Sequence, residues 1–255
     1  MAEVERDVVL GADEVARFAA SIGYPAGLVP PTYGMALVAR GDVGLDAALT
    51  ALAQKHRSIV VHATQSIQLQ RTLKVGETVR LRMTLSDPGE PGPNAKRVTL
   101  TVTLSDRDGS PAVTMKSGMF LLPSMPPANA KKLPDGSGPP CASRVFTAAD
   151  VALYASASGD RNPIHLDPAV ASAFGLRAPI AHGMLVLGWM TGVFATEHPQ
   201  EVLRSLDCIF VSPVFVGDEG QARIGEQQGD KYRFSIANSD DNLVLSGSLM
   251  AQRIS

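Results

Sequence analysis

The sequence has little cysteine and almost no net charge. Its 255 residues include two cysteines, Cys141 and Cys208, which do not form a metal-spaced pair. Two isolated cysteines in a chain of this length argue against a disulfide framework and indicate a reducing compartment. The formal net charge is −2 and no stretch is obviously basic, which argues against nucleic acid as a partner.

Long hydrophobic runs are also missing. The longest apolar stretch, residues 184–195, is too short to cross a bilayer, which takes about 20 residues. The first ten residues are acidic and lack the apolar core of a signal peptide. We therefore expect a cytoplasmic protein with no membrane association. The content of 45% hydrophobic and 19% charged residues is that of a globular chain with a sizeable core.

Residues 123–143 are rich in proline, glycine, serine and alanine and show no apolar period. This composition predicts a linker between residues 1–122 and residues 144–255. The two flanking parts repeat the same order of elements.

Each part opens with a short amphipathic helix that ends at a glycine, over residues 12–23 and residues 148–159. The strings at 31–35 and 180–184 each precede an apolar run rich in small residues, which predicts a buried helix. A repeat in two copies indicates a duplication.

Alternating strands close both parts. Residues 98–122 and residues 232–254 each read as two strands joined by turn residues, which predicts a hairpin. Runs of strands that follow a helix favour the α+β class.

The loop after the second short helix carries the clearest chemical signal. Asp160 and His165 lie five positions apart. Gly159 comes directly before Asp160, and Asn162 and Pro163 lie between the two. Glycine permits unusual backbone angles and proline fixes φ, so this string predicts a rigid loop that directs both titratable side chains to one point. Such convergence is what a proton-transfer site needs.

The pattern G-D-x-N-P-x-H over residues 159–165 resembles the signature of the MaoC-like hydratases, also called type 2 or (R)-specific enoyl-CoA hydratases. The strings at 181–184 and 213–218 are similar to two further motifs of that family, in the same order. The resemblance covers the second part well, and the first part is a diverged copy.

The resemblance implies an α+β double hot-dog fold, in which each unit wraps an antiparallel sheet around a long helix. Residues 1–122 would form a degenerate, non-catalytic unit and residues 144–255 a catalytic one. Two such units in one chain already make a pseudo-dimer, so a monomer and a homodimer are both compatible with it.

The resemblance also implies reversible addition of one water to a 2-enoyl thioester, which gives an (R)-3-hydroxyacyl product. Asp160 would act as the base, and His165 would orient the water or carry its proton. The substrate would be carried as a thioester of CoA or of acyl carrier protein, with no cofactor. Gly183 lies where free N–H groups and the helix dipole would polarise the thioester carbonyl. Asn162 would position the loop, with Thr191 and His182 in supporting roles.

Other interpretations of these residues stay open. Asp160 and His165 could form a metal pair, but no third histidine or cysteine lies at ligand spacing in the sequence. They could also brace the loop as an ion pair. His182 could be a cap or packing residue, Gly183 could serve helix packing, and Thr191 could bond back to its own helix. Three other histidines are predicted to be structural: His56, His62 and His198.

The first part does not repeat the acid–base pair. Tyr24, Ala26 and Val29 stand opposite Asp160, Asn162 and His165, and the counterpart of residues 165–177 is largely missing. We therefore expect this part to complete the sheet and make room for an acyl chain. Candidate cations for carrier phosphates are Arg71, Lys74, Arg97 and Arg177.

Three further functions remain as alternatives. The first is a 3-hydroxyacyl-ACP dehydratase of fatty-acid or polyketide synthesis. The second is a non-catalytic subunit that binds acyl thioesters, although the intact loop at 159–165 argues against it. The third is a thioesterase on the same fold.

Overall fold

A computed structural model describes most of the chain. The described residues are 2–40, 44–90, 92, 94–123, 131–134, 137–225 and 229–254.

The described residues of the first part form five strands and three helices. In chain order these are β1 (Ala2–Val9), α1 (Ala12–Ile22), α2 (Tyr33–Ala39), α3 (Leu45–His56), β2 (Ile59–Leu69), β3 (Thr78–Leu85), β4 (Lys96–Ser105) and β5 (Pro111–Leu122). The predicted hairpin of residues 98–122 is present as β4 and β5, which pair antiparallel.

Where the structure describes it, the second part also has five strands and three helices, together with one 3₁₀ turn. These are β6 (Ala142–Val145), α4 (Ala148–Ser158), η1 (Pro163–His165), α5 (Pro168–Ala173), α6 (Gly183–Glu197), β7 (Glu201–Phe210), β8 (Glu219–Ile224), β9 (Lys231–Asn238) and β10 (Leu243–Arg253). The strand β6 takes in the last two residues of the stretch predicted as a linker.

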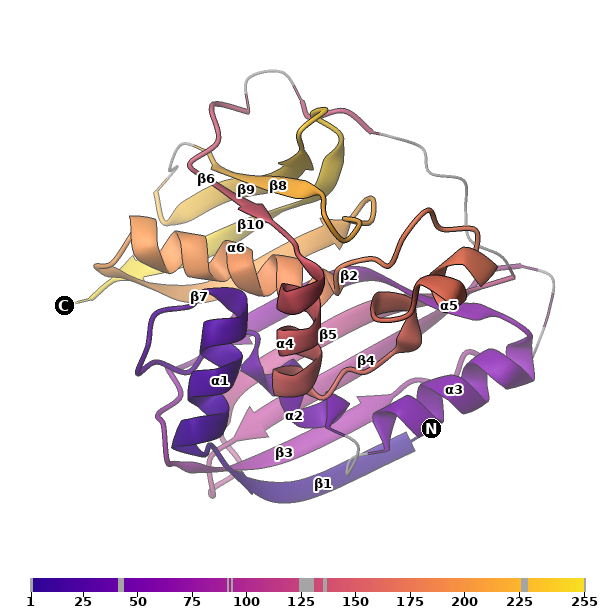
Figure 1. Ribbon diagram of the computed structural model, residues 1–255. Coiled ribbons are helices and arrows are strands. Elements are labelled where there is room, and N and C mark those ends of the chain that lie inside the picture. Colours follow the sequence, from indigo (N-terminus) through magenta and orange to yellow (C-terminus); the bar gives the residue numbers. More distant parts are fainter. Residues whose placement is uncertain are drawn as a thin grey trace.

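All ten strands form one sheet in the order β1-β3-β4-β5-β2-β7-β10-β9-β8-β6. The order is symmetric about the middle, because each strand of the first part has its counterpart at the same distance from the centre. The two central strands, β2 and β7, pair antiparallel, with Thr64 opposite Ile209 and Gln68 opposite Ser205. The two parts therefore share an unbroken hydrogen-bonded sheet (Figure 1).

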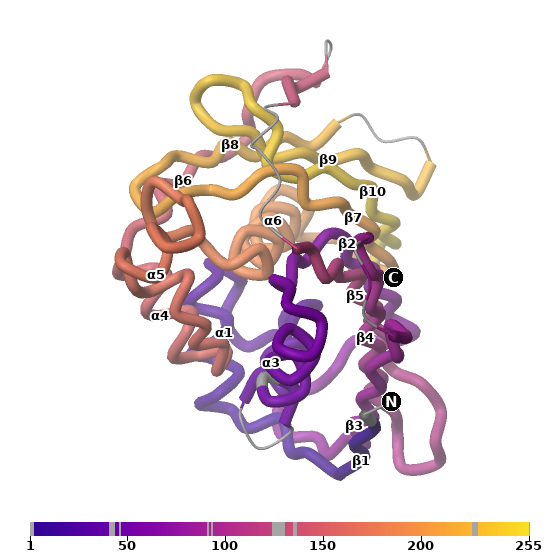
Figure 2. Tube along the Cα trace, turned by 90° about the vertical axis from the view of Figure 1, so that its right-hand side faces the viewer, coloured from indigo at the N-terminus to yellow at the C-terminus, as the bar shows by residue number. Residues whose placement is uncertain are grey.

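The helices lie on the concave side of this curved sheet (Figure 2). The strands of the second part wrap around α6, whose residues from Met184 to Phe194 are all buried. A helix that is apolar on every side is typical of a core position. No helix among the described residues is both long and apolar enough to cross a membrane.

Close packing of α1 against α6 joins the helices of the two parts. A Cβ atom added to Gly192 of α6 would lie 2.6 Å from the carbonyl oxygen of Gly23, and one added to Gly188 would lie 2.9 Å from the side chain of Ile22. The small residues that the sequence places on α6 thus allow another helix to approach its backbone.

The first part departs from the expected single buried helix. The helix that begins at Tyr33 ends at Ala39, and a separate helix begins at Leu45. Arg40 has extended backbone angles and Gly44 has a φ of 74°. Neither conformation continues an α-helix. The apolar run therefore folds as α2 and α3, and among the described residues of the first part no helix is as long as α6.

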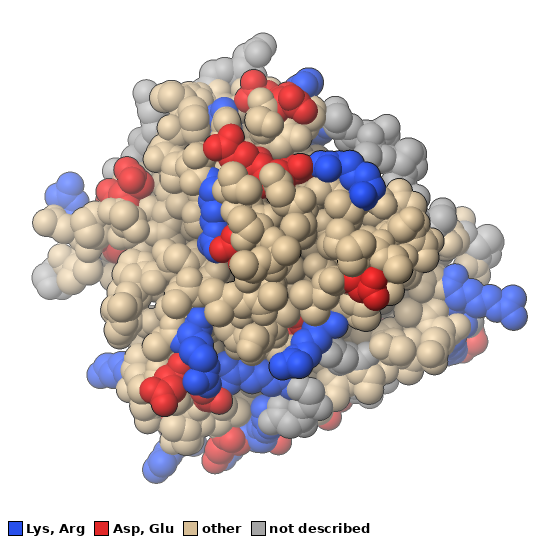
Figure 3. All heavy atoms as spheres, in the orientation of Figure 1, with Lys and Arg blue, Asp and Glu red and all other residues tan. Residues whose placement is uncertain are grey.

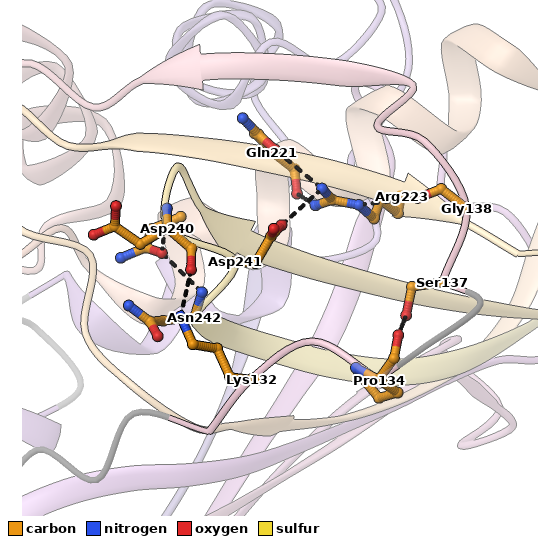
Figure 4. A network of polar contacts seen from close by, with 10 residues as sticks. Lys132, Pro134, Ser137, Gly138, Gln221, Arg223, Asp240, Asp241 and Asn242 are labelled. Atoms are coloured by element: carbon orange, nitrogen blue, oxygen red, sulfur yellow. Dashed lines mark hydrogen bonds and ion pairs between the residues drawn. The ribbon is translucent and has the colours of Figure 1, made fainter.

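The stretch between the two parts is attached to the second one (Figure 4). Lys132 forms an isolated antiparallel bridge with Asn242, and its Nζ donates to the carbonyl of Asp240. The buried guanidinium of Arg223 donates to the carbonyl of Gly138 and pairs with Asp241. Residues 124–130 and 135–136 of the predicted linker lie outside the described residues.

We expect Gly192→Ala to lower the free energy of unfolding by about 1–3 kcal/mol, because the new methyl group meets backbone that cannot swing aside. Urea denaturation would measure this change. Gly225→Ala is the matched control, since its Cβ would lie 3.5 Å from the nearest atom, an ordinary contact. Equal losses in the two variants would contradict tight packing between α1 and α6.

Candidate active site

The loop that carries Asp160 is fixed by the end of α4. This helix starts with a capping box between Thr147 and Asp150 and ends at Gly159, whose φ of 84° is left-handed. Left-handed angles suit glycine because it has no Cβ. The chain therefore turns sharply, and Asp160 follows directly after the turn.

Hydrogen bonds between residues two positions apart then hold the loop in shape. The N–H of Asn162 donates to Oδ1 of Asp160, and the N–H of Ile164 donates to Oδ1 of Asn162, each at 3.2 Å. Pro163 opens the 3₁₀ turn that carries His165. Asn162 thus braces the turn, as asparagine commonly does, and its own side chain is exposed.

His165 is held in one tautomer. Its Nδ1 lies 2.8 Å from the carbonyl oxygen of Ile180. A carbonyl only accepts, so the proton of the neutral ring lies on Nδ1, and Nε2 keeps a free lone pair. Burial lowers the pKa of His165 below its usual 6.5, which keeps the ring neutral near pH 7.

His182 packs directly on this ring. The two imidazoles are stacked with centroids 3.8 Å apart, and Tyr154 covers His182 with centroids 4.9 Å apart. Nε2 of His182 donates to the carbonyl of Asp160 at 3.1 Å. Burial, followed by the neighbouring His165, lowers the pKa of His182 to about 4. This histidine makes no capping bond to α6, so it connects the helix start to the loop.

Asp160, His165 and His182 offer one donor atom each, and these atoms all lie within 4.8 Å of one another. The sequence has no third histidine or cysteine at ligand spacing, but the fold brings His182, which is distant in sequence, next to the other two groups. The three groups have the composition of a metal site as well as that of an acid–base site.

Gly183 is the first residue of α6 and lies beside these groups. The first N–H groups of a helix have no partner within it, and the positive end of the helix dipole is located there. A Cβ at this position would lie 3.1 Å from the ring of Phe210. The absence of a side chain therefore lets the Phe210 ring pack closely against the start of α6.

Thr191 is not part of this cluster. It is buried, and its hydroxyl donates to the carbonyl of Gly188 at 2.7 Å. It lies eight residues beyond Gly183, or about 12 Å along the helix at the usual rise. Two candidate cations are engaged elsewhere: Arg71 pairs with Glu77 and Asp106, and Arg177 pairs with Asp218.

The comparisons with known proteins cover both parts of the chain. Residues 133–246 match the model described as "MaoC like domain". Residues 13–115 match the model described as "FAS1-like, dehydratase domain region". A 3-hydroxybutyryl-CoA dehydratase of Methylorubrum extorquens is 33% identical over 116 residues, which are 42% of this chain and 73% of that protein.

The chain belongs to the MaoC-like dehydratase family. An (R)-specific enoyl-CoA hydratase of Aeromonas caviae is 40% identical over 84 residues, which are 32% of this chain and 63% of that protein. The match spans less than two thirds of the length of each of the first curated relatives. The crystal structure of HtdX from Mycobacterium tuberculosis superposes with a TM-score of 0.76 at 22% identity, covering 97% of this chain and 99% of that one.

These findings confirm the expected family and the α+β double hot-dog fold. The "MaoC like domain" match contains the whole loop and α6. The dehydratase-region match runs from the second residue of α1 into the first residues of β5. The MaoC-like match and the dehydratase-region match thus lie side by side, joined by the β2–β7 pair.

His62 was expected to be structural, and the structure places it beside the site. A bulge between His62 and Thr64 shifts the register of β2 against β5, so that His62 lies opposite Met119. A bulge reverses which side chains face inward. The imidazole packs on Phe210 with centroids 4.8 Å apart, and the charge of Asp160 acts on its pKa. The only sequence feature that could have placed His62 near the site is its position beside a run of β-branched residues.

We expect His62 to make folding sensitive to acid. Burial lowers its pKa to about 4, whereas the unfolded chain has the ordinary 6.5. As pH falls below about 6.5, His62 binds a proton in the unfolded state but stays neutral in the folded state. Stability is therefore lost on acidification, by up to about 3 kcal/mol near pH 4.

Denaturation of the wild type and His62→Phe between pH 7.5 and 4.5 would measure this contribution. The variant should show the shallower loss of unfolding free energy. Parallel curves would rule out the proposed sensitivity.

Proposed function

We propose that the protein is an (R)-specific 2-enoyl-CoA hydratase, or in reverse a 3-hydroxyacyl thioester dehydratase. The observation that carries this is the free Nε2 of His165 beside Asp160, at the uncapped start of α6. Relatives named as an enoyl-CoA hydratase, a hydroxybutyryl-CoA dehydratase and a 3-hydroxyacyl-[acyl-carrier-protein] dehydratase support the reaction, and they include both carriers.

The geometry suits a single water held by two acceptors. Nε2 of His165 and the carboxylate of Asp160 would each accept one of its hydrogen bonds, which leaves an oxygen lone pair directed at C3 of the enoyl group. As the C3–O bond forms, one proton leaves the water for the acid–base pair, and one proton passes from the pair to C2. The balance is the addition of H and OH to one double bond.

Negative charge develops on the thioester oxygen during this step. The N–H of Gly183 and the positive end of α6 would stabilise it, a contribution typically worth roughly 3–4 kcal/mol. Phe210 closes one side of this position, which limits water access. Low pKa values keep the two stacked imidazoles neutral near pH 7, so that His165 accepts a hydrogen bond.

We further propose that residues 144–255 form the catalytic unit and that residues 1–122 carry no second site. Tyr24 and Val29, which stand where Asp160 and His165 stand in the second part, bear no base that works near neutral pH. Burial raises the pKa of Tyr24 to about 12. The 3₁₀ turn and α5 also have no counterpart between α1 and α2 among the described residues.

Asp160→Asn and His165→Ala should each lower kcat by about 10²–10⁴-fold and keep the fold. Loss of the enoyl-thioester absorbance band with crotonyl-CoA, and then with a longer 2-enoyl-CoA, would measure turnover. Chiral analysis of the product should show the (R) alcohol. His198→Gln is the control, because this histidine lies at the other end of α6.

Near wild-type rates in either site variant would refute the mechanism. If the folded wild type turned over no CoA ester, the same assay with acyl-carrier-protein thioesters would test the alternative of a 3-hydroxyacyl-ACP dehydratase. Inactivity on both carriers, with binding retained, would indicate a non-catalytic subunit.

Because Asp160, His165 and His182 could also bind a metal ion, the dependence of activity on metal needs to be measured. His182 already uses Nε2 on the carbonyl of Asp160 and His165 uses Nδ1 on that of Ile180, which suits proton transfer without a metal ion. We therefore expect dialysis against EDTA to leave kcat unchanged. Loss of activity that returns with Zn²⁺ would assign these residues to a metal centre instead.

A further inference from the structure

Arg40 connects the non-catalytic part of the chain to the loop of the site. It follows the last residue of α2, at the point where the expected long helix of the first part breaks. In Figure 1, the end of α2 lies next to the end of α4. The guanidinium is half-buried there, with 25% of the side chain exposed.

The guanidinium donates to the end of α4. Nη2 of Arg40 lies 3.2 Å from the carbonyl oxygen of Ala157. The last carbonyl groups of a helix have no partner within it and form the negative end of its dipole. A cation at this position satisfies one of them and is favoured by the dipole. Asp160 follows only three residues later.

Two further contacts hold the side chain in this position. Nη1 of Arg40 pairs with Glu14 of α1 at 3.2 Å, and the guanidinium carbon lies 5.5 Å from the centroid of the Tyr33 ring. Figure 3 shows basic and acidic side chains gathered together over this region of α1, α2 and α4. Contacts within the first part of the chain thus orient the guanidinium toward the carbonyl of the second part.

The backbone of Arg40 also supports the loop. A Cβ added to Gly159 would lie 2.8 Å from Cα and 2.9 Å from N of Arg40. Gly159 therefore lies flat against the backbone of the first part, at the residue just before Asp160. This backbone contact does not depend on the guanidinium hydrogen bond, and it supports the same turn at the end of α4.

We propose that Arg40 is a positioning residue for the catalytic loop, by which the first part fixes the start of the 159–165 turn. The inference rests on the proposed hydratase function for its kinetic consequence. Loss of the guanidinium would release the last turn of α4 and move Asp160 relative to His165. Displacements of about 1 Å can cost about 10²-fold in rate, with little effect on substrate binding.

The test compares Arg40→Ala and Arg40→Lys with Arg82→Ala. Arg82 also pairs with a glutamate across two strands, and its side chain is 57% exposed. We expect Arg40→Ala to lower kcat by about 10²-fold with KM within a few fold of wild type. Arg40→Lys should recover much of the rate, because the ammonium group can still donate to a carbonyl.

Chemical rescue gives a readout that a purely structural role would not produce. Arg40 and Glu14 line an open cavity of about 470 Å³, through which methylguanidinium could enter the Ala variant and restore kcat. Hydrogen exchange of residues 157–165 should be faster in Arg40→Ala than in the wild type, and unchanged in Arg82→Ala.

The exchange measurement separates the two proposals. If the wild type hydrates no thioester, the proposed function fails, and faster exchange in Arg40→Ala would still support the brace. Wild-type kcat in Arg40→Ala, or unchanged exchange of residues 157–165, would overturn it. If Arg40→Ala does not fold, Arg40→Lys is compared with the wild type instead. A partial loss of kcat together with partly faster exchange of residues 157–165 would then support the proposal.

Discussion

The antiparallel pairing of β2 with β7 is the interaction on which the rest of the structure depends. It joins two five-strand units into one sheet, and it sets the distance at which helices of the two units meet. Phe210 ends β7 and lies against Gly183, while His62 lies on β2 and packs on Phe210. Without this pair of strands, the start of α6 would lack the ring that covers it.

Local rules account for much of the site. The glycine that ends α4, the asparagine that braces the turn and the proline that opens the 3₁₀ turn act within a few residues, so the string 159–165 predicts its own shape. The start of α6 follows from an apolar run after a glycine. Asp160, His165 and Gly183 were predicted as site residues; Asp160 and His165 lie in one cluster with His182, and Gly183 follows His182 at the start of α6. Their catalytic roles stay a prediction.

The parts that escaped prediction are those set by contacts between distant segments. The inward position of His62 depends on a one-residue bulge in β2, and a period-2 pattern does not reveal where such a shift occurs. The bond from Arg40 to Ala157 joins residues 117 positions apart. The break between α2 and α3 gave no signal strong enough to outweigh the apolar pattern around it.

The union of both units in one chain changes what a substitution can do. In a symmetric pair of identical chains, every replacement appears twice, so a residue useful as a brace on one side must also be tolerated at the active site of the other. Here the strand order is symmetric, but each position is independent. Under the proposed function, Tyr24 and Val29 stand in place of an acid–base pair and the end of α2 supports the catalytic loop, while the second unit keeps the chemistry.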